Sequence, residues 1–274
     1  QMRFSTRSIV LAATLAAAAP ATPAGAGVGD LLVAPTRLVL DGRRGAEIIL
    51  NNIGDETATY RISVEFRRMT PEGGLVDVAE PTAADKIAEE MIRYAPRRVT
   101  LAPNQPQSIR ISARPPQGLP DGEYRVHMLF RAIPPATPVV SRAAAPPRGV
   151  SFALTPIYGV TIPVIVRLGQ LEAKAGIANV QLDSNDGKPA VSLDLSRSGA
   201  RSTFGEVRVL KPGEKDPIAI QRAVAVYHEL TSRSVAIPVN PEFAGEVRGP
   251  VTVQYVEIFE DGSRTIAETQ AVLR

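Results

Sequence analysis

The chain has 274 residues, with 31 lysines and arginines, 28 aspartates and glutamates, and no cysteine. The absence of cysteine excludes disulfides, thiolate catalysis and zinc–thiolate sites. Arg3 and Arg7 belong to a segment that we expect to be removed. Without these two of its 31 basic residues, the chain keeps 29 basic residues and 28 acidic ones. The charge therefore gives no reason to expect a nucleic-acid partner, and the length allows two domains of about 120 residues each.

The first 26 residues have the pattern of a secretory signal peptide. Arg3 and Arg7 precede an apolar run, and the small residues Ala24 and Ala26 stand just before the expected cut. A membrane anchor is the alternative, but the run is short and rich in alanine and proline, which favours cleavage. Since no later apolar stretch is long enough to span a bilayer, we expect export without membrane insertion of the cleaved chain.

From residue 27 onward, valine and isoleucine alternate with polar residues in short runs. Turn signals such as Asp41-Gly42 and Asn185-Asp186-Gly187 separate these runs, and this spacing indicates antiparallel β-sandwiches. A continuous apolar run gives way to a polar stretch at Gly169. We therefore predict an all-β protein with two immunoglobulin-like β-sandwich domains, residues 27–168 and 169–274, that meet at an angle and leave a cleft.

One segment has the periodicity of a helix. Thr82 can cap a helix together with Asp85, and Ile87, Met91 and Tyr94 share one helical face. We predict a short helix within residues 82–94, inserted between strands of the first domain.

The strand predicted at residues 150–167 carries apolar side chains on one face and follows a stretch rich in proline, alanine and arginine. A half-apolar edge strand of this kind is suited to pairing with another chain, and packing in its own core is the alternative. Pro156 and Pro163 lie at opposite parity along the strand, so we expect a bulge at Gly159 between two halves. The apolar face consists of Phe152, Leu154, Tyr158, Val160, Ile162, Val164 and Val166.

Candidate catalytic groups are scarce. The only histidines, His127 and His228, lie within alternating strand patterns, where a single histidine is more often a packed or surface residue than a base. The phosphate-binding loop, the nucleophile elbow and the HExxH zinc pattern are missing. Residues 183–187 imitate the start of a calcium loop, but the glycine comes too early, so we predict a hairpin turn. We expect no enzymatic activity, no metal and no cofactor.

Three segments of the first domain carry a resemblance to a known family. They are APTRLVLDGRRGAEIILNNIGDETATYRISVEF (34–66), YAPRRVTLAPNQPQSIRI (94–111) and LPDGEYRVHMLFRAIPP (119–135). In order, spacing and turn residues they resemble the N-terminal domain of the periplasmic pilus-assembly chaperones of the chaperone–usher pathway, the PapD-like family. The second domain is similar only in length and strand rhythm.

The resemblance implies a boomerang of two immunoglobulin-like domains in the periplasm. Such a protein binds pilus or fimbrial subunits that lack a strand, fills their groove with its own edge strand, and passes them to an outer-membrane usher. Strand addition of this kind combines main-chain hydrogen bonds with pockets for alternate side chains.

The resemblance also assigns roles to individual residues. Arg37 matches the cleft arginine that binds the subunit's C-terminal carboxylate, a bidentate and charge-assisted interaction. Glu123, Arg167 and Asp261 match an interdomain ion-pair cluster, with three separate surface charges as the alternative. The side chains that would enter the subunit's groove are Phe152, Leu154, Tyr158, Val160 and Ile162.

The chain departs from the family at one anchor. Aligning Val164 to Arg167 with the family's equivalent run sets Pro163 where a lysine stands, and proline has neither charge nor N–H. Thr161 is a weak substitute for that lysine. The departure keeps a second function open, that of a binding or structural protein of the cell envelope with the same fold and no chaperone cycle.

Overall fold

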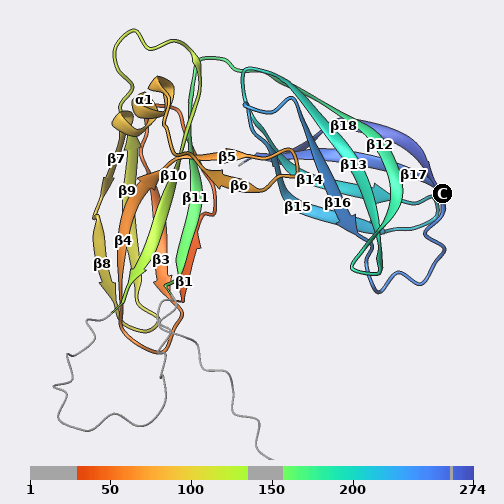
Figure 1. The fold of residues 1–274 in the computed structure, drawn as a ribbon, viewed down its shortest axis with the longest axis horizontal. Coiled ribbons are helices and arrows are strands. Elements are labelled where there is room, and N and C mark those ends of the chain that lie inside the picture. The colour runs from red at the N-terminus through yellow and green to blue at the C-terminus, as the bar shows by residue number, and fades with distance from the viewer. Residues whose placement is uncertain (1–29, 135–156, 260–261) are drawn as a thin grey trace, which may run out of the picture.

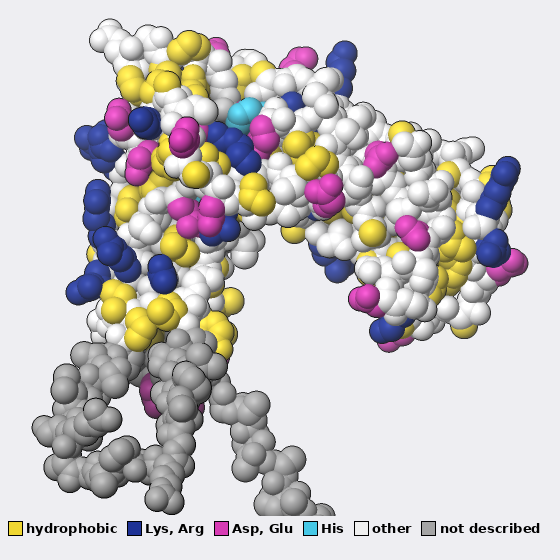
Figure 2. Space-filling view, viewed as in Figure 1, with side chains coloured by type: hydrophobic (Ala, Val, Ile, Leu, Met, Phe, Trp, Pro, Cys, Tyr) yellow, Lys and Arg dark blue, Asp and Glu magenta, His cyan; other side chains and the backbone are white. Residues whose placement is uncertain are grey.

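The computed structural model describes residues 30–134, 157–259 and 262–274, which form two β-sandwiches that meet at an angle (Figure 1 and Figure 2). The strands of the N-terminal sandwich lie within residues 31–168 and those of the C-terminal sandwich within residues 173–273. Each sandwich has its own apolar core. The predicted all-β fold with two sandwich domains at an angle is confirmed.

Two sheets face each other in the N-terminal sandwich. One has the strand order β1 (Leu31–Ala34), β3 (Ala46–Asn52), β9 (Pro106–Ala113), β7 (Ile92–Ala95). The other has the order β2 (Leu38–Leu40), β11 (Gly159–Leu168), β10 (Gly122–Ile133), β4 (Ala58–Glu65), β8 (Arg98–Leu101). Neighbouring strands are antiparallel except β2 and β11, which are parallel.

The alternation of apolar and polar residues explains this core. Along β3, Ile48 and Leu50 are fully buried, whereas Glu47 and Ile49 face solvent. Burying one side chain of this size is worth roughly 1.5–3 kcal/mol. Strands of the facing sheet contribute further large buried side chains to this core, which include Tyr60, Leu101, Met128, Phe130 and Ile162.

The helix α1 (Ala83–Met91) of the N-terminal sandwich begins as predicted. Asp85 N–H donates to Thr82 Oγ1, and Thr82 N–H donates to the Asp85 carboxylate at 2.8 Å. The helix ends earlier than predicted, because Tyr94 belongs to β7 and lies opposite Ile111 of β9. Pro96, which follows β7, disfavours the helical conformation before it. Within the described residues, no helix is long and apolar enough to cross a membrane.

The C-terminal sandwich also has two sheets. One contains β12 (Ala173–Asn185), β13 (Lys188–Gly199) and β16 (Ser232–Pro238). The other contains, in order, β15 (Ala219–Val226), β14 (Thr203–Leu210), β17 (Gly249–Phe259) and β18 (Gly262–Leu273). Asp186 and Gly187 join β12 to β13 with φ angles of 50° and 74°, the left-handed backbone of a two-residue hairpin turn. The turn predicted at residues 183–187 is therefore confirmed.

A hairpin of the N-terminal sandwich, β5 (Arg67–Met69) with β6 (Leu75–Asp77), reaches the C-terminal sandwich (Figure 1). Met69 packs there with Ala225 and Tyr227, and its N–H donates to the Glu229 carboxylate at 3.0 Å. The Ser234 N–H donates to the carbonyl of Pro71 at 2.8 Å. This bridge was not predicted, because its partners are about 160 residues apart in the chain.

β11 pairs with β10 without any register shift from Gly159 to Leu168. The pairing continues to Tyr158, whose carbonyl accepts the Ala132 N–H at 2.9 Å, so the predicted bulge at Gly159 is wrong. Since Ala132 and Tyr158 form a hydrogen-bonded pair, the odd-numbered residues of β11 direct their N–H groups away from β10. Pro163 is odd-numbered, and β11 therefore loses no hydrogen bond to β10 there.

Candidate functional site

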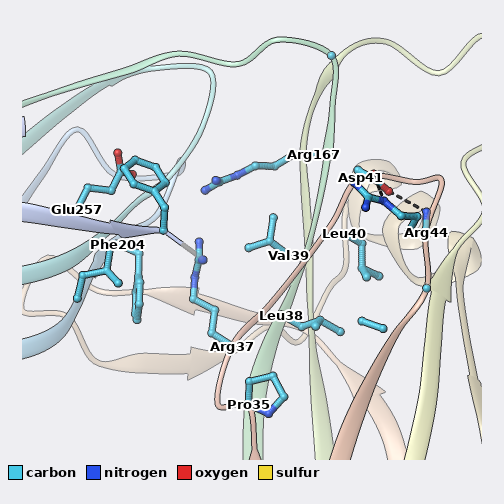
Figure 3. Close-up of a pocket in the computed structure, with 15 residues that line it drawn as sticks. Pro35, Arg37, Leu38, Val39, Leu40, Asp41, Arg44, Arg167, Phe204 and Glu257 are labelled. Atoms are coloured by element: carbon cyan, nitrogen blue, oxygen red, sulfur yellow. Dashed lines mark hydrogen bonds and ion pairs between the residues drawn. The ribbon is translucent and has the colours of Figure 1, made fainter. Parts of the chain in front are cut away.

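A cleft of about 780 Å³ lies where the two sandwiches meet (Figure 3). Arg37, in the short connection between β1 and β2, lines the cleft together with Val39 of β2 and Arg167 of β11. Phe204 of β14 and Glu257 of β17 line it from the C-terminal sandwich. Figure 3 shows Arg37 extending into the cleft beside Phe204.

Arg37 is a partly buried cation. Its Nε and Nη2 atoms are inaccessible to solvent and have no hydrogen-bond partner in the described part of the chain, and its guanidinium lies 4.6 Å from the centroid of the Phe204 ring. Burial, and then the charge of Arg167, lower the pKa of Arg37 to about 10, which leaves it protonated at neutral pH. Buried donors without acceptors are costly, and a guanidinium is best matched by a carboxylate or a phosphate. The cleft therefore has the chemistry of an anion site.

Arg167 is held by a buried carboxylate and by the C-terminal sandwich. It lies opposite Glu123 in the pairing of β10 and β11, and its Nε donates to Glu123 Oε2 at 2.9 Å. Ser202 N–H and Oγ donate to the same oxygen at 3.0 and 2.9 Å, and Arg167 Nη2 donates to the Ser202 carbonyl at 3.0 Å. No sequence pattern indicated that Ser202 belongs to this cluster with Glu123 and Arg167. Asp261, the third residue expected in this cluster, lies outside the described residues.

The carboxylate of Glu123 is ionised although its side chain is fully buried. Burial raises its pKa, but the nearby His228 ring, the charge of Arg167 and the hydrogen bonds from Ser202 outweigh burial and lower the pKa to about 2. The His228 Nδ1 atom lies 3.6 Å from Glu123 Oε1. Glu123 Oε2 thus accepts hydrogen bonds from both sandwiches, whereas Oε1 has no hydrogen-bond partner in the described part of the chain.

Glu257 is the other carboxylate that lines the cleft, and it too is paired. Arg201 binds it in a bidentate manner, with Arg201 Nη2 donating to Glu257 Oε2 at 2.9 Å. Arg264 Nη2 lies 3.7 Å from the same oxygen. No sequence pattern indicated this pair, because 56 residues separate Arg201 from Glu257. Glu257 is therefore already matched by cations other than Arg37.

A second ion pair joins the sandwiches beside the hairpin β5–β6. Arg125 of β10 donates to both oxygens of Glu229, at 2.6 and 3.0 Å, and its guanidinium lies 3.7 Å from the centroid of the Tyr227 ring. Since Glu229 also accepts the Met69 N–H, one carboxylate binds two strands of the N-terminal sandwich. These residues are separated by about a hundred positions or more in the chain, and no sequence pattern indicates that they meet.

The two histidines have different environments. His127 is almost fully buried, and neither ring nitrogen has a hydrogen-bond partner in the described part of the chain. Burial, followed by the charge of Arg125, lowers its pKa to about 3, so it is neutral at neutral pH. The side chain of His228 is 43% exposed. No group of three or more histidine, aspartate or glutamate residues in the described ranges could hold a metal ion.

One side of β11 is open over part of its length. β2 pairs only with Val164 to Val166, and no described strand pairs with the side of residues 159–163 that faces away from β10. The outward N–H groups there belong to Gly159 and Thr161, since Pro163 has none. Thr161 Oγ1 donates to Glu65 Oε1 at 2.8 Å. Because β2 is parallel to β11 and Leu38 lies opposite Val164, Arg37 stands at the end of this open edge.

The predicted groove-filling side chains have different positions. Phe152 and Leu154 lie outside the described residues. Tyr158 is 48% exposed, and Val160 packs partly against the core. Ile162 is only 2% exposed and belongs to the core of its own sandwich, so the expectation that its side chain enters a partner's groove is wrong. Ile157 is an exposed apolar residue at this end of β11 that the sequence analysis did not single out.

Comparisons with known proteins give structural matches only. No protein-family model matches the chain, and no curated protein matches its sequence. The Escherichia coli chaperone DraB is 17% identical, with 91% of this chain and 99% of that chain covered and a TM-score of 0.46. The Pseudomonas aeruginosa chaperone CupB2 is 14% identical, with coverages of 89% and 100% and a TM-score of 0.46. A chain in the complex of the Salmonella enterica SafA pilin with the SafB chaperone is 16% identical, with coverages of 91% and 99% and a TM-score of 0.45.

Replacing Glu123 by glutamine should weaken the joint between the sandwiches. Removing one partner of a buried ion pair leaves the other uncompensated, so we expect the free energy of unfolding to fall by about 3 kcal/mol at pH 7. Because the pKa of Glu123 is lowered to about 2, its stabilisation is full above the unfolded-state value near 4.5 and is lost as the pH falls towards 2. The difference between wild type and E123Q in urea titrations should shrink over that window.

The matched control for this prediction is Glu47→Gln, which removes an exposed carboxylate paired with Arg110 at 3.4 Å. An exposed pair contributes about 0–1 kcal/mol, so this variant should remain close to wild type. Equal losses in the two variants would contradict the role given to Glu123.

Replacing His127 by leucine should remove part of the acid sensitivity of the fold. The pKa of His127 is lowered to about 3 from an ordinary value near 6.5, so the unfolded chain binds a proton that the folded chain does not. Wild-type stability should therefore fall as the pH drops from 6.5 towards 3, by up to about 1.4 kcal/mol per pH unit from this residue. In denaturant titrations, the free energy of unfolding of H127L should depend less on pH than that of wild type. The same pH dependence in H127L and in wild type above pH 5 would refute the prediction.

Proposed function

We propose that the protein is a periplasmic chaperone for pilus or other surface-fibre subunits that lack a strand. Its edge strand β11 lends main-chain hydrogen bonds and apolar side chains to the open groove of the subunit. The observation that carries the proposal is the position of Arg37, a partly buried guanidinium without a hydrogen-bond partner in the described structure, at the end of the open edge of β11. The proposal includes export by a cleaved signal peptide, residues 1–26, and delivery of the subunit to an outer-membrane usher.

The open edge of β11 and the cleft can contact the same bound strand. A strand added along residues 159–163 can exchange hydrogen bonds with the outward backbone groups of Gly159 and Thr161. At Pro163 the ladder loses its donor, and there the cleft supplies Arg37 in place of a main-chain bond. A strand that ends at this point brings its C-terminal carboxylate to the guanidinium, with which it forms a charge-assisted contact.

Apolar contacts supplement the ladder. Tyr158 and Ile157 are about half exposed, and an apolar groove that covered them would remove their side chains from water. Phe152 and Leu154, in the residues before them, remain proposed groove-filling side chains. Ile162 instead holds β11 to its own core, which keeps the strand in place while its edge is used.

The role of Arg37 is tested by Arg37→Ala in cells that co-express a fibre subunit lacking a strand. Truncating one partner of a buried charged contact costs 2–5 kcal/mol in binding, so the subunit recovered in the complex should fall about 30-fold or more. Arg43→Ala removes an exposed arginine nearby and serves as the control. Equal recovery with R37A and wild type would overturn the anchor.

The use of the β11 edge is tested by Thr161→Pro. Its N–H points away from β10, so the substitution removes an outward donor and leaves the pairing with β10 intact. Thr161→Val keeps the N–H but loses the hydroxyl that bonds Glu65, and it is the matched control. We expect about tenfold weaker subunit binding by T161P relative to T161V in pull-down titrations, with similar melting temperatures.

A binding or structural protein of the cell envelope is the second candidate, and Pro163 is the observation that favours it, because it interrupts the ladder at the cleft. The two candidates differ in one outcome. If T161P and R37A both protect the subunit from protease as well as wild type does, the chaperone function fails and the envelope function stands.

A further inference from the structure

Three arginines lie side by side on the N-terminal sandwich, away from the cleft. Arg131 of β10 is opposite Arg61 of β4, and Arg61 is opposite Arg98 of β8. Directly opposite residues of antiparallel strands project from the same face of the sheet, and neighbouring strands are about 4.8 Å apart. All three side chains are exposed. We call them the arginine row.

No charge in the described ranges neutralises this row. Arg67, Arg68 and Arg110 of the same sandwich each pair with a carboxylate within 4.0 Å, whereas none of the three arginines of the row does. Like charges directly opposite each other on a sheet are destabilising. The three guanidinium groups are therefore available to pair with an external anion.

The row borders polar residues and two half-buried apolar residues of β10, Leu129 and Ile133. Thr59 and Thr100 form the adjacent cross-strand pair, with their hydroxyl oxygens 2.8 Å apart, and no exposed large apolar side chain lies on β4, β8 or β10. Protein–protein interfaces usually have apolar or aromatic anchors at their centre, and these three strands expose none.

We infer that the arginine row is a docking surface for the anionic phospholipid headgroups of a membrane. Guanidinium groups suit phosphate oxygens, and a flat sheet face that carries several of them meets a planar array of phosphates better than it meets a single soluble anion. In the order β2-β11-β10-β4-β8 the row runs from β10 to β8, away from the open edge of β11. None of the three arginines lines the cleft, and only Arg131, which lies opposite Gly159, borders the edge strand.

The experiment is sedimentation of the exported protein with vesicles of phosphatidylcholine, with and without about 30% phosphatidylglycerol, at low and at physiological salt. We expect binding only to the anionic vesicles and weaker binding at higher salt. The triple variant R61Q/R98Q/R131Q should bind about 100-fold more weakly, because each basic residue near an anionic surface contributes a factor of about five. Arg61→Gln alone removes the central charge and should bind about fivefold more weakly.

The matched control is R43Q/R114Q/R248Q, which removes three exposed arginines elsewhere and changes the net charge equally. It should bind like wild type, since it leaves the row intact. The triple row variant should also melt no earlier than wild type, because like-charge pairs are removed. Absence of wild-type binding to anionic vesicles, equal binding to neutral ones, or equal losses in the row and control variants would each overturn the inference in favour of an acidic protein partner or a solvated face.

Discussion

The buried carboxylate of Glu123 is the constraint on which the arrangement of the cleft depends. One of its oxygens accepts hydrogen bonds from Arg167 of the N-terminal sandwich and from Ser202 of the C-terminal sandwich. Oε2 of Glu123 is occupied in this way and Glu257 is paired with Arg201, and among the described residues neither carboxylate forms an ion pair with Arg37. Arg37 thus has no ion-pair partner in the described part of the cleft because the surrounding carboxylates pair with other groups. No strain at Arg37 itself is required.

The same face of β10 continues this joint along the strand. Glu123, Arg125 and His127 alternate with core residues and face the C-terminal sandwich, where Ser202, Glu229 and Tyr227 meet them. Buried ion pairs roughly break even in stability once their desolvation is counted, so they fix the angle between the sandwiches more than they strengthen the fold. The neutral and unbonded His127 ring adds a cost that grows in acid.

Local patterns in the sequence were sufficient for the two sandwiches, for the start of the helix at Thr82 and for the hairpin turn at Asp186, because neighbouring residues determine these features. The end of the helix was misjudged because Tyr94 pairs with a distant strand, and Ile162 was misjudged because an apolar strand face looks alike whether it fills its own core or another protein's groove. Arg125 and Glu229 are 104 positions apart, and no periodicity reports such a contact. The resemblance implies the role of Arg37, but the lack of a hydrogen-bond partner for its guanidinium in the described structure depends on residues distant in the chain, which no local pattern indicates.

The parallel strand β2 has a consequence for the protein's behaviour towards copies of itself. A long bare sheet edge is a template for uncontrolled association, but β2 covers Val164 to Val166 and Pro163 withholds a further donor. In the described part of β11, two outward N–H groups are available to pair with a strand of a second copy. Such a pairing would contribute little binding energy. A strand that ends in a carboxylate can pair with the same N–H groups and can also bind the guanidinium of Arg37. The short open edge therefore disfavours pairing between copies of this protein. It favours binding of a strand that ends in a free carboxylate.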